Sequence, residues 1–102
     1  MTFDMLQKLM RIANYFTIGM TMFEVQESGN IRQHTLRQID VNILSNEMMM
    51  IITFVCENQS SDLYEYFTYD DLDNGTLFIF ESMANEQSAK NMVKYYGDVS
   101  NG

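Results

Sequence analysis

The first 15 residues repeat apolar side chains at the spacing of an α-helix, which predicts a helix over residues 3 to about 15. Thr2 is placed to cap its N-terminus, and Asp4 in the first turn suits the helix dipole. The apolar positions form two sets, which together predict a broad buried stripe: Phe3, Leu6, Leu9, Met10 and Ala13, with Met5 and Ile12 as the second set.

Five later segments are typical of β-strands, because β-branched and aromatic residues are frequent in them and turn residues separate them. They cover residues 20–27, 31–44, 47–57, 63–69 and 76–81. Segment 31–44 begins polar and ends in clean alternation, so we expect its first half to project or to lie at a sheet edge. Segment 47–57 is a continuous apolar run between two acids, which predicts a central strand buried on both faces.

Turn and capping residues set the remaining connections. Asp73-Asn74-Gly75 is the strongest hairpin signal in the chain, and it predicts that segments 63–69 and 76–81 pair directly. A final helix is expected over about residues 84–96, followed by Gly97 as its C-terminal glycine.

These elements predict an α+β fold in the order α-β-β-β-β-β-α. It consists of a single antiparallel sheet of about five strands, flanked by an N-terminal and a C-terminal helix. With 102 residues the chain has room for one core, so we expect one globular domain over residues 1–97 and a flexible tail over residues 98–102.

The formal net charge is −8, and its distribution along the chain is uneven. The interval from Gln38 to Ala89 contains ten acidic residues and no basic one. Such an interval repels phosphate, which disfavours direct nucleic-acid binding. It fits either a basic protein partner or simply a soluble, self-repelling surface.

Segments that would direct the protein to a membrane are not predicted. The start of the chain alternates charged and apolar residues without the apolar core of a signal peptide. The longest apolar run, residues 48–56, is too short to cross a bilayer. We therefore expect a cytoplasmic protein with no membrane contact, in the cytoplasm of the host cell if a phage encodes it.

Catalytic and metal chemistry find little support in the sequence. The chain has one cysteine, Cys56, and one histidine, His34, so it offers neither an internal disulfide nor a zinc site of four such ligands. Cys56 lies in an apolar run and is expected to be buried, and His34 lies among polar residues and is expected to be exposed. No cofactor, no metal and no enzymatic activity are predicted.

The segment from Asp70 to Glu81 partly resembles a calcium-binding EF-hand loop. Asp70, Asn74, Gly75 and Glu81 fall at matching loop positions, but Leu72 stands where an oxygen ligand is needed. We therefore expect a hairpin turn here rather than a calcium site.

Acidic residues and tyrosines alternate between residues 57 and 73, and they form the candidate partner-binding site. Tyr64, Tyr66 and Thr68 are expected to share one side of a strand. Rigid aromatic anchors beside charges that steer a cationic partner are typical of protein interfaces. The candidate residues are Glu57, Asp62, Tyr64, Glu65, Tyr66, Tyr69, Asp70, Asp71 and Asp73.

The short single domain, the base-free interval and this carboxylate cluster resemble the small acidic inhibitors encoded by phages and mobile elements, of the anti-CRISPR and anti-restriction type. The resemblance is one of class, and no signature motif carries it. It implies a non-enzymatic inhibitor that binds a basic nuclease or other nucleic-acid-binding effector and blocks its DNA or RNA site by charge mimicry.

Three other classes share parts of this profile. Bacterial immunity proteins, which neutralise basic toxins, have the same electrostatics, and acidic secretion chaperones are a more distant likeness. A homo-oligomeric structural protein, for example a homodimer, is the third alternative, with Met48-Met49-Met50 at the subunit interface.

Overall fold

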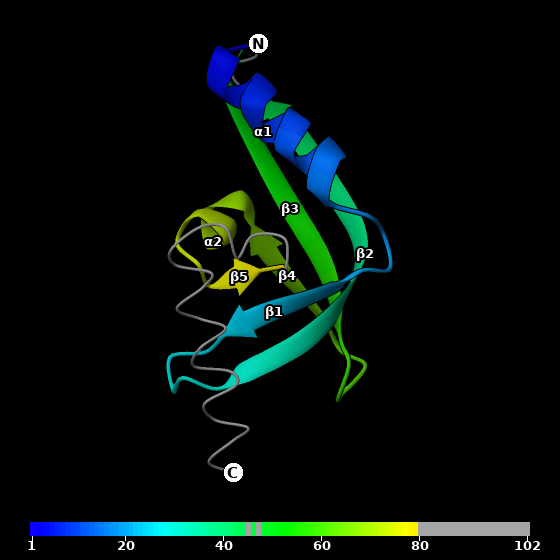
Figure 1. Ribbon diagram of the computed structural model, residues 1–102. Coiled ribbons are helices and arrows are strands. Elements are labelled where there is room, and N and C mark those ends of the chain that lie inside the picture. The colour runs from blue at the N-terminus through cyan, green and yellow to red at the C-terminus, as the bar shows by residue number, and fades with distance from the viewer. Residues whose placement is uncertain (45, 47, 80–102) are drawn as a thin grey trace.

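The computed structural model describes residues 1–44, 46 and 48–79, which form one five-stranded antiparallel sheet with two helices (Figure 1). This confirms the α+β class and the single antiparallel sheet. The predicted final helix over residues 84–96 and the tail over residues 98–102 lie outside the described residues. The elements are α1 (Phe3–Tyr15), β1 (Thr21–Val25), β2 (Ile31–Leu44), β3 (Met49–Asn58), β4 (Tyr64–Thr68), α2 (Tyr69–Asp73) and β5 (Leu77–Phe78).

The strands lie in the order β4-β3-β2-β1-β5, so β4 and β5 are at opposite edges of the described sheet. The predicted hairpin between them is wrong, because α2 intervenes and β5 pairs with β1 instead. The Asp71 carboxylate accepts a hydrogen bond from the Thr68 backbone N–H (2.8 Å), which starts a helical turn where the strand would have continued. Gly75, at φ 81°, follows this helix and turns the chain toward β5.

Strand β2 changes the direction of its side chains part-way along. The register with β3 shifts between Leu36 and Gln38, so Arg37 is an extra residue in the ladder. Before the shift His34 and Leu36 face the core, and after it Ile39 does. The expectation that the first half of β2 projects is wrong, since that half lies between β1 and β3. The second half, from Val41 to Leu44, is the exposed one.

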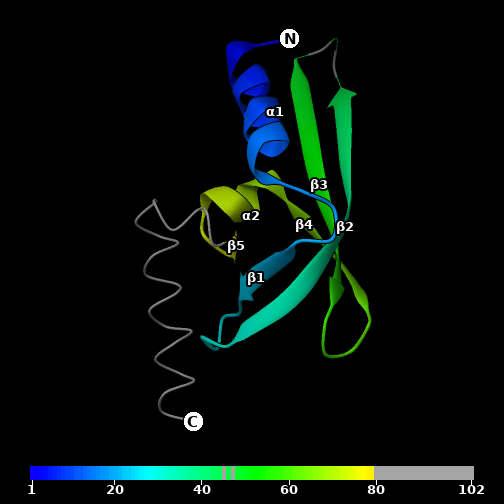
Figure 2. The ribbon, with the colours of Figure 1, turned by 45° about the vertical axis from the view of Figure 1, so that its right-hand side comes forward.

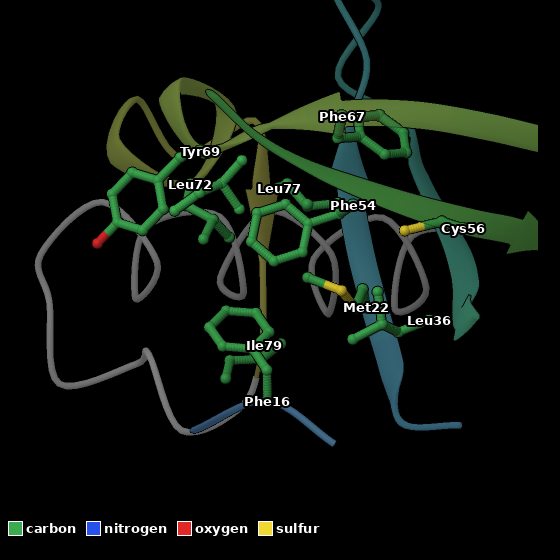
Figure 3. Close-up of a cluster of buried hydrophobic side chains, with 11 residues drawn as sticks. Phe16, Met22, Leu36, Phe54, Cys56, Phe67, Tyr69, Leu72, Leu77 and Ile79 are labelled. Carbon is green, nitrogen blue, oxygen red and sulfur yellow. The ribbon is translucent and has the colours of Figure 1, made fainter. Parts of the chain in front are cut away.

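The main core lies between the inner face of the sheet, α2 and the end of α1 (Figure 3). Phe54 is fully buried at its centre, and its ring lies 5.2 Å from that of Phe16. Full burial of one such side chain contributes about 1.5–3 kcal/mol. Burial of β3 on both faces is confirmed for Phe54 to Cys56 only. The core comprises Phe16, Met22, Leu36, Ile52, Phe54, Cys56, Phe67, Tyr69, Leu72, Leu77 and Ile79.

Helix α1 lies along the far part of the β2–β3 hairpin (Figure 2). The Thr2 hydroxyl caps it as predicted, accepting a hydrogen bond from the Met5 backbone N–H at 3.2 Å. Met5 is buried, whereas Phe3, Leu6 and Met10 are exposed. The predicted buried stripe is therefore only half right, because this hairpin is two strands wide and covers one side of the helix.

Candidate functional site

The candidate binding residues on β4 separate to the two faces of the sheet. Tyr64 lies opposite Glu57 and Tyr66 opposite Val55, and both tyrosines point to the outer face, with 55% and 70% of their surface exposed. The exposure of Thr68 as well confirms that these three residues share one side. Glu65 lies opposite Cys56 and therefore faces inward.

Tyr69 is a core residue rather than a surface anchor, which corrects its place in the predicted site. Only 8% of its surface is exposed, and it packs in the main hydrophobic cluster. Its hydroxyl accepts a hydrogen bond from Arg11 Nη1 (3.1 Å), and Lys8 Nζ lies 5.1 Å from the centre of its ring. Tyr69 thus holds α1 against the rest of the molecule, partly through cation–π contacts.

Basic residues from the start of the chain lie against several of the candidate acids. Folding brings Arg37 to Glu57 at 2.7 Å, Arg32 to Glu65 at 3.1 Å and Arg11 to Asp73 at 3.6 Å. Lys8 contacts Asp4 at 3.3 Å on α1. All four basic residues of the described ranges are therefore used in ion pairs within the molecule.

The other acids of the candidate set lie outside the sheet. Asp70 is exposed at the start of α2, and Asp71 beside it caps the helix. Asp62 is exposed in the loop between β3 and β4, where its φ of 59° is left-handed. The predicted site is therefore not one patch: its members lie on both faces of β4, in this loop and on α2.

The expected absence of a calcium loop remains a prediction. Leu72, at the position that should supply an oxygen, is buried in the core, and the segment after Asp70 forms a helix rather than a ligand loop. Glu81 lies outside the described residues.

His34 is fully buried, and the expectation of an exposed histidine is wrong. Its Nε2 lies 2.9 Å from Glu24 Oε1 and 3.4 Å from Glu65 Oε2. The three ligand-type atoms all lie within 4.8 Å of one another. Strands β1, β2 and β4 contribute one residue each, so no spacing along the sequence could have revealed this cluster.

The surroundings of this cluster are polar on one side and apolar on the other. Arg32 contacts the second oxygen of Glu65, and its guanidinium in turn donates to the side-chain carbonyl of Gln26 at 2.8 Å. The ring of Phe67 meets that of His34 edge to face at 5.2 Å. A groove of about 940 Å³ begins beside it, lined among others by Arg32, Asn58 and Glu65.

Cys56 is buried, as predicted. Burial raises the pKa of its thiol from 9.0 to about 12, with a smaller contribution from the negative charges of Glu65 and Glu24. At neutral pH the thiol is therefore fully protonated.

Comparisons of the chain with protein-family models, with curated proteins and with solved structures found no match. Among the described residues, no helix has the length and apolar character needed to span a membrane.

Proposed function

We propose that the protein is a non-enzymatic inhibitor that binds a basic nucleic-acid-processing defence protein and blocks its DNA or RNA site by charge mimicry. The surface around β4 and its neighbouring loop makes the contact. The observation that carries the proposal is electrostatic: every basic residue in the described ranges is already paired internally, which leaves an excess of carboxylates.

The described ranges hold ten acidic and four basic residues, a net charge of −6. Each of the four basic residues contacts a carboxylate of the same molecule. None of these cations is left to attract phosphate, whereas the unneutralised carboxylates attract a cationic surface and accelerate its association.

Tyr64 and Tyr66 supply an anchor that loses water on binding, which charge alone does not provide. Tyr64 and Tyr66 project side by side from β4, at one edge of the described sheet. Exposed tyrosines at a strand edge combine a large rigid contact area with a hydroxyl, a combination that is frequent at binding hot spots. Asp62 lies just before this strand and adds negative charge beside the anchors.

The test is cleavage of a DNA substrate by a panel of purified CRISPR and restriction nucleases in the presence of this protein. We expect inhibition of at least one nuclease, weakened by added salt and by excess DNA. Tyr64→Thr with Tyr66→Thr should raise the half-inhibitory concentration about tenfold or more, because the anchors are lost while strand propensity is kept.

A matched pair of charge variants distinguishes electrostatic steering by a carboxylate beside β4 from an effect of the overall negative charge of the protein. Asp62→Asn removes one charge beside β4 at a left-handed position that asparagine tolerates. Glu27→Gln removes one exposed charge outside the candidate site. We expect the first variant to slow association about two- to threefold and the second to have no effect. Equal effects of the two variants, or no inhibited nuclease, would contradict the proposal.

The same design covers the alternative of an immunity protein, in which a basic toxin replaces the nuclease panel. The inhibited protein is the only difference between these two functions. Inhibition of a toxin, lost in the double tyrosine variant, would select this alternative.

One observation favours a homo-oligomeric structural protein as a second candidate. Met48, with 71% of its surface exposed, and Met49 lie at the far end of the β2–β3 hairpin. Phe3, with 74% of its surface exposed, lies on α1. Clustered exposed apolar residues mark interaction surfaces. Light scattering across a concentration series tests this function, and a constant monomer mass would exclude it.

A further inference from the structure

We propose that Glu24, His34 and Glu65 form a binding site for one divalent transition-metal ion of the zinc type. The proposal does not rest on the proposed inhibitor function. The site lies on the inner face of the sheet, whereas Tyr64 and Tyr66 point to the outer face, although Tyr64 also lines the groove that begins beside His34. Three ligand atoms converge there, and one of them is a carboxylate oxygen without a hydrogen-bond partner among the described residues.

Two carboxylates compete for a single imidazole nitrogen. Nε2 of His34 carries at most one proton, which it donates to Glu24 Oε1 at 2.9 Å when this tautomer is present. Glu65 Oε2, at 3.4 Å from the same nitrogen, is buried and has no hydrogen-bond partner among the described residues. A buried acceptor without a donor is costly, and an ion between the three atoms would satisfy both carboxylates.

The distances are close to those of a tetrahedral site. Zinc binds nitrogen and oxygen ligands at about 2.0–2.2 Å, so the edges of its tetrahedron are about 3.3–3.6 Å. The Nε2 atom lies 2.9 and 3.4 Å from the two carboxylate oxygens, and no pair of the three atoms is more than 4.8 Å apart. Side-chain adjustments of less than about 1 Å would therefore create three ligands.

The donor set selects the class of metal. One imidazole nitrogen with two carboxylates suits zinc, iron or manganese, whereas magnesium and calcium prefer oxygen ligands only. Arg32 binds Glu65 Oε1 and leaves Oε2 for the ion, as partners of metal ligands commonly do. Glu65 and Arg32 also line the groove described above, through which an ion can enter.

One feature of the site weakens the binding. When a metal binds Nε2, the imidazole proton lies on Nδ1, and Nδ1 is buried with no hydrogen-bond partner in the part of the chain that the structure describes. The missing acceptor is expected to lower the affinity about 10- to 100-fold relative to a fully supported histidine ligand. The proposed affinity is therefore moderate.

The experiment is a titration of the untagged full chain, stripped with EDTA and dialysed, with ZnCl2 in a calorimeter. We expect one ion per chain and at least tenfold weaker binding for Glu65→Gln, whose side chain is a third exposed and thus tolerates substitution. Glu57→Gln is the matched control, because Glu57 also pairs with an arginine but lies on the outer face. The zinc affinity of the Glu57→Gln variant should equal that of the unmodified protein.

The single histidine of the chain gives a second readout that needs no variant. Nitrogen-resolved NMR of the His34 ring should show the Nδ1–H tautomer when zinc is added, with Nε2 bound to metal. Zinc that binds without changing the His34 ring signals, or equal affinities of Glu65→Gln and the unmodified protein, would overturn the proposal. So would the absence of zinc binding, which would leave the cluster as a buried ion pair.

Discussion

The two halves of the β2–β3 hairpin share one ladder of hydrogen bonds but are built differently. In the half from His34 to Ile39, paired with Phe54 to Asn58, other strands continue the sheet on both sides and the core covers it. In the half from Asn42 to Leu44, paired with Met49 to Ile51, no further strand of the described sheet pairs on either side. Helix α1 lies alongside this half, and many of its apolar side chains are exposed.

This difference shows that strand pairing and strand burial are separate properties. Both halves have the alternating or continuous apolar pattern of strands, and both form strands. Apart from Ile52, the buried residues of the hairpin lie in the half that has a strand on each side. Packing supplies most of the stability of such a structure. The far half keeps an apolar surface, which a monomer rarely exposes without a use for it.

The largest difference between the halves should appear on truncating one side chain in each. Phe54→Ala removes a fully buried ring and should lower the free energy of unfolding by about 3–5 kcal/mol. Met49→Ala, at an exposed position of the far half, should lower it by less than about 0.5 kcal/mol. Urea denaturation followed by circular dichroism measures both, and similar losses would show that the far half is packed as well.

The free energy of unfolding should also decrease at alkaline pH, because Cys56 lies in the buried half. Its folded pKa of about 12 lies above the ordinary 9.0, so the unfolded thiol ionises first as the pH rises. The contribution to stability is complete below pH 9 and is lost between pH 9 and 12, at about 1.4 kcal/mol per pH unit.

The comparison is with Cys56→Ala, because this variant isolates the contribution of the thiol. Denaturation with EDTA present, at pH 8, 9 and 10, should give a shallower decline for this variant than for the unmodified protein. Parallel pH profiles would mean that the thiol is accessible enough to ionise in the folded state.

An effect smaller than that of Phe54→Ala is expected from the helix that lies along the far half. Thr2→Ala removes the cap of α1 and should cost about 1 kcal/mol. Hydrogen exchange should accelerate in α1 and little in the five-stranded part, since the helix is attached at its other end by Tyr69. Thr2→Ser keeps a hydroxyl cap and serves as the control. Uniform acceleration across the molecule would indicate that the halves unfold together.

Local sequence patterns predicted the helices and strands of the described residues well, but they predicted less well which strands pair with each other. The start of α1 and the boundaries of β2 agree with the sequence pattern because caps and alternation are local signals. Asp73-Asn74-Gly75 was assigned to a hairpin, but its residues end a short helix, and the same turn chemistry serves both uses. The partner of β5 depends on packing between distant segments, which no local pattern encodes.

The candidate site shows the same limit. The sequence separates acidic and basic residues, yet antiparallel pairing places Arg32 and Arg37 of β2 beside acids of β4 and β3. An exposed His34 was predicted because its neighbours in the sequence are polar. In the structure it is buried and contacts two carboxylates from other strands. Alternation along β4 did place Tyr64 and Tyr66 together, since a strand fixes that arrangement by itself.

The pairing of β5 with β1 also bears on how the chain folds as it is synthesised. Strands β1 to β4 each pair with the next strand in sequence and can form a meander early. Phe23 of β1 can pair with Phe78 of β5 only after the residues between them have been synthesised. Closing so long a loop is slow compared with forming the hairpins. Until then β1 is an open sheet edge in a nascent chain, and that interval is when pairing with a second copy competes most strongly with correct folding.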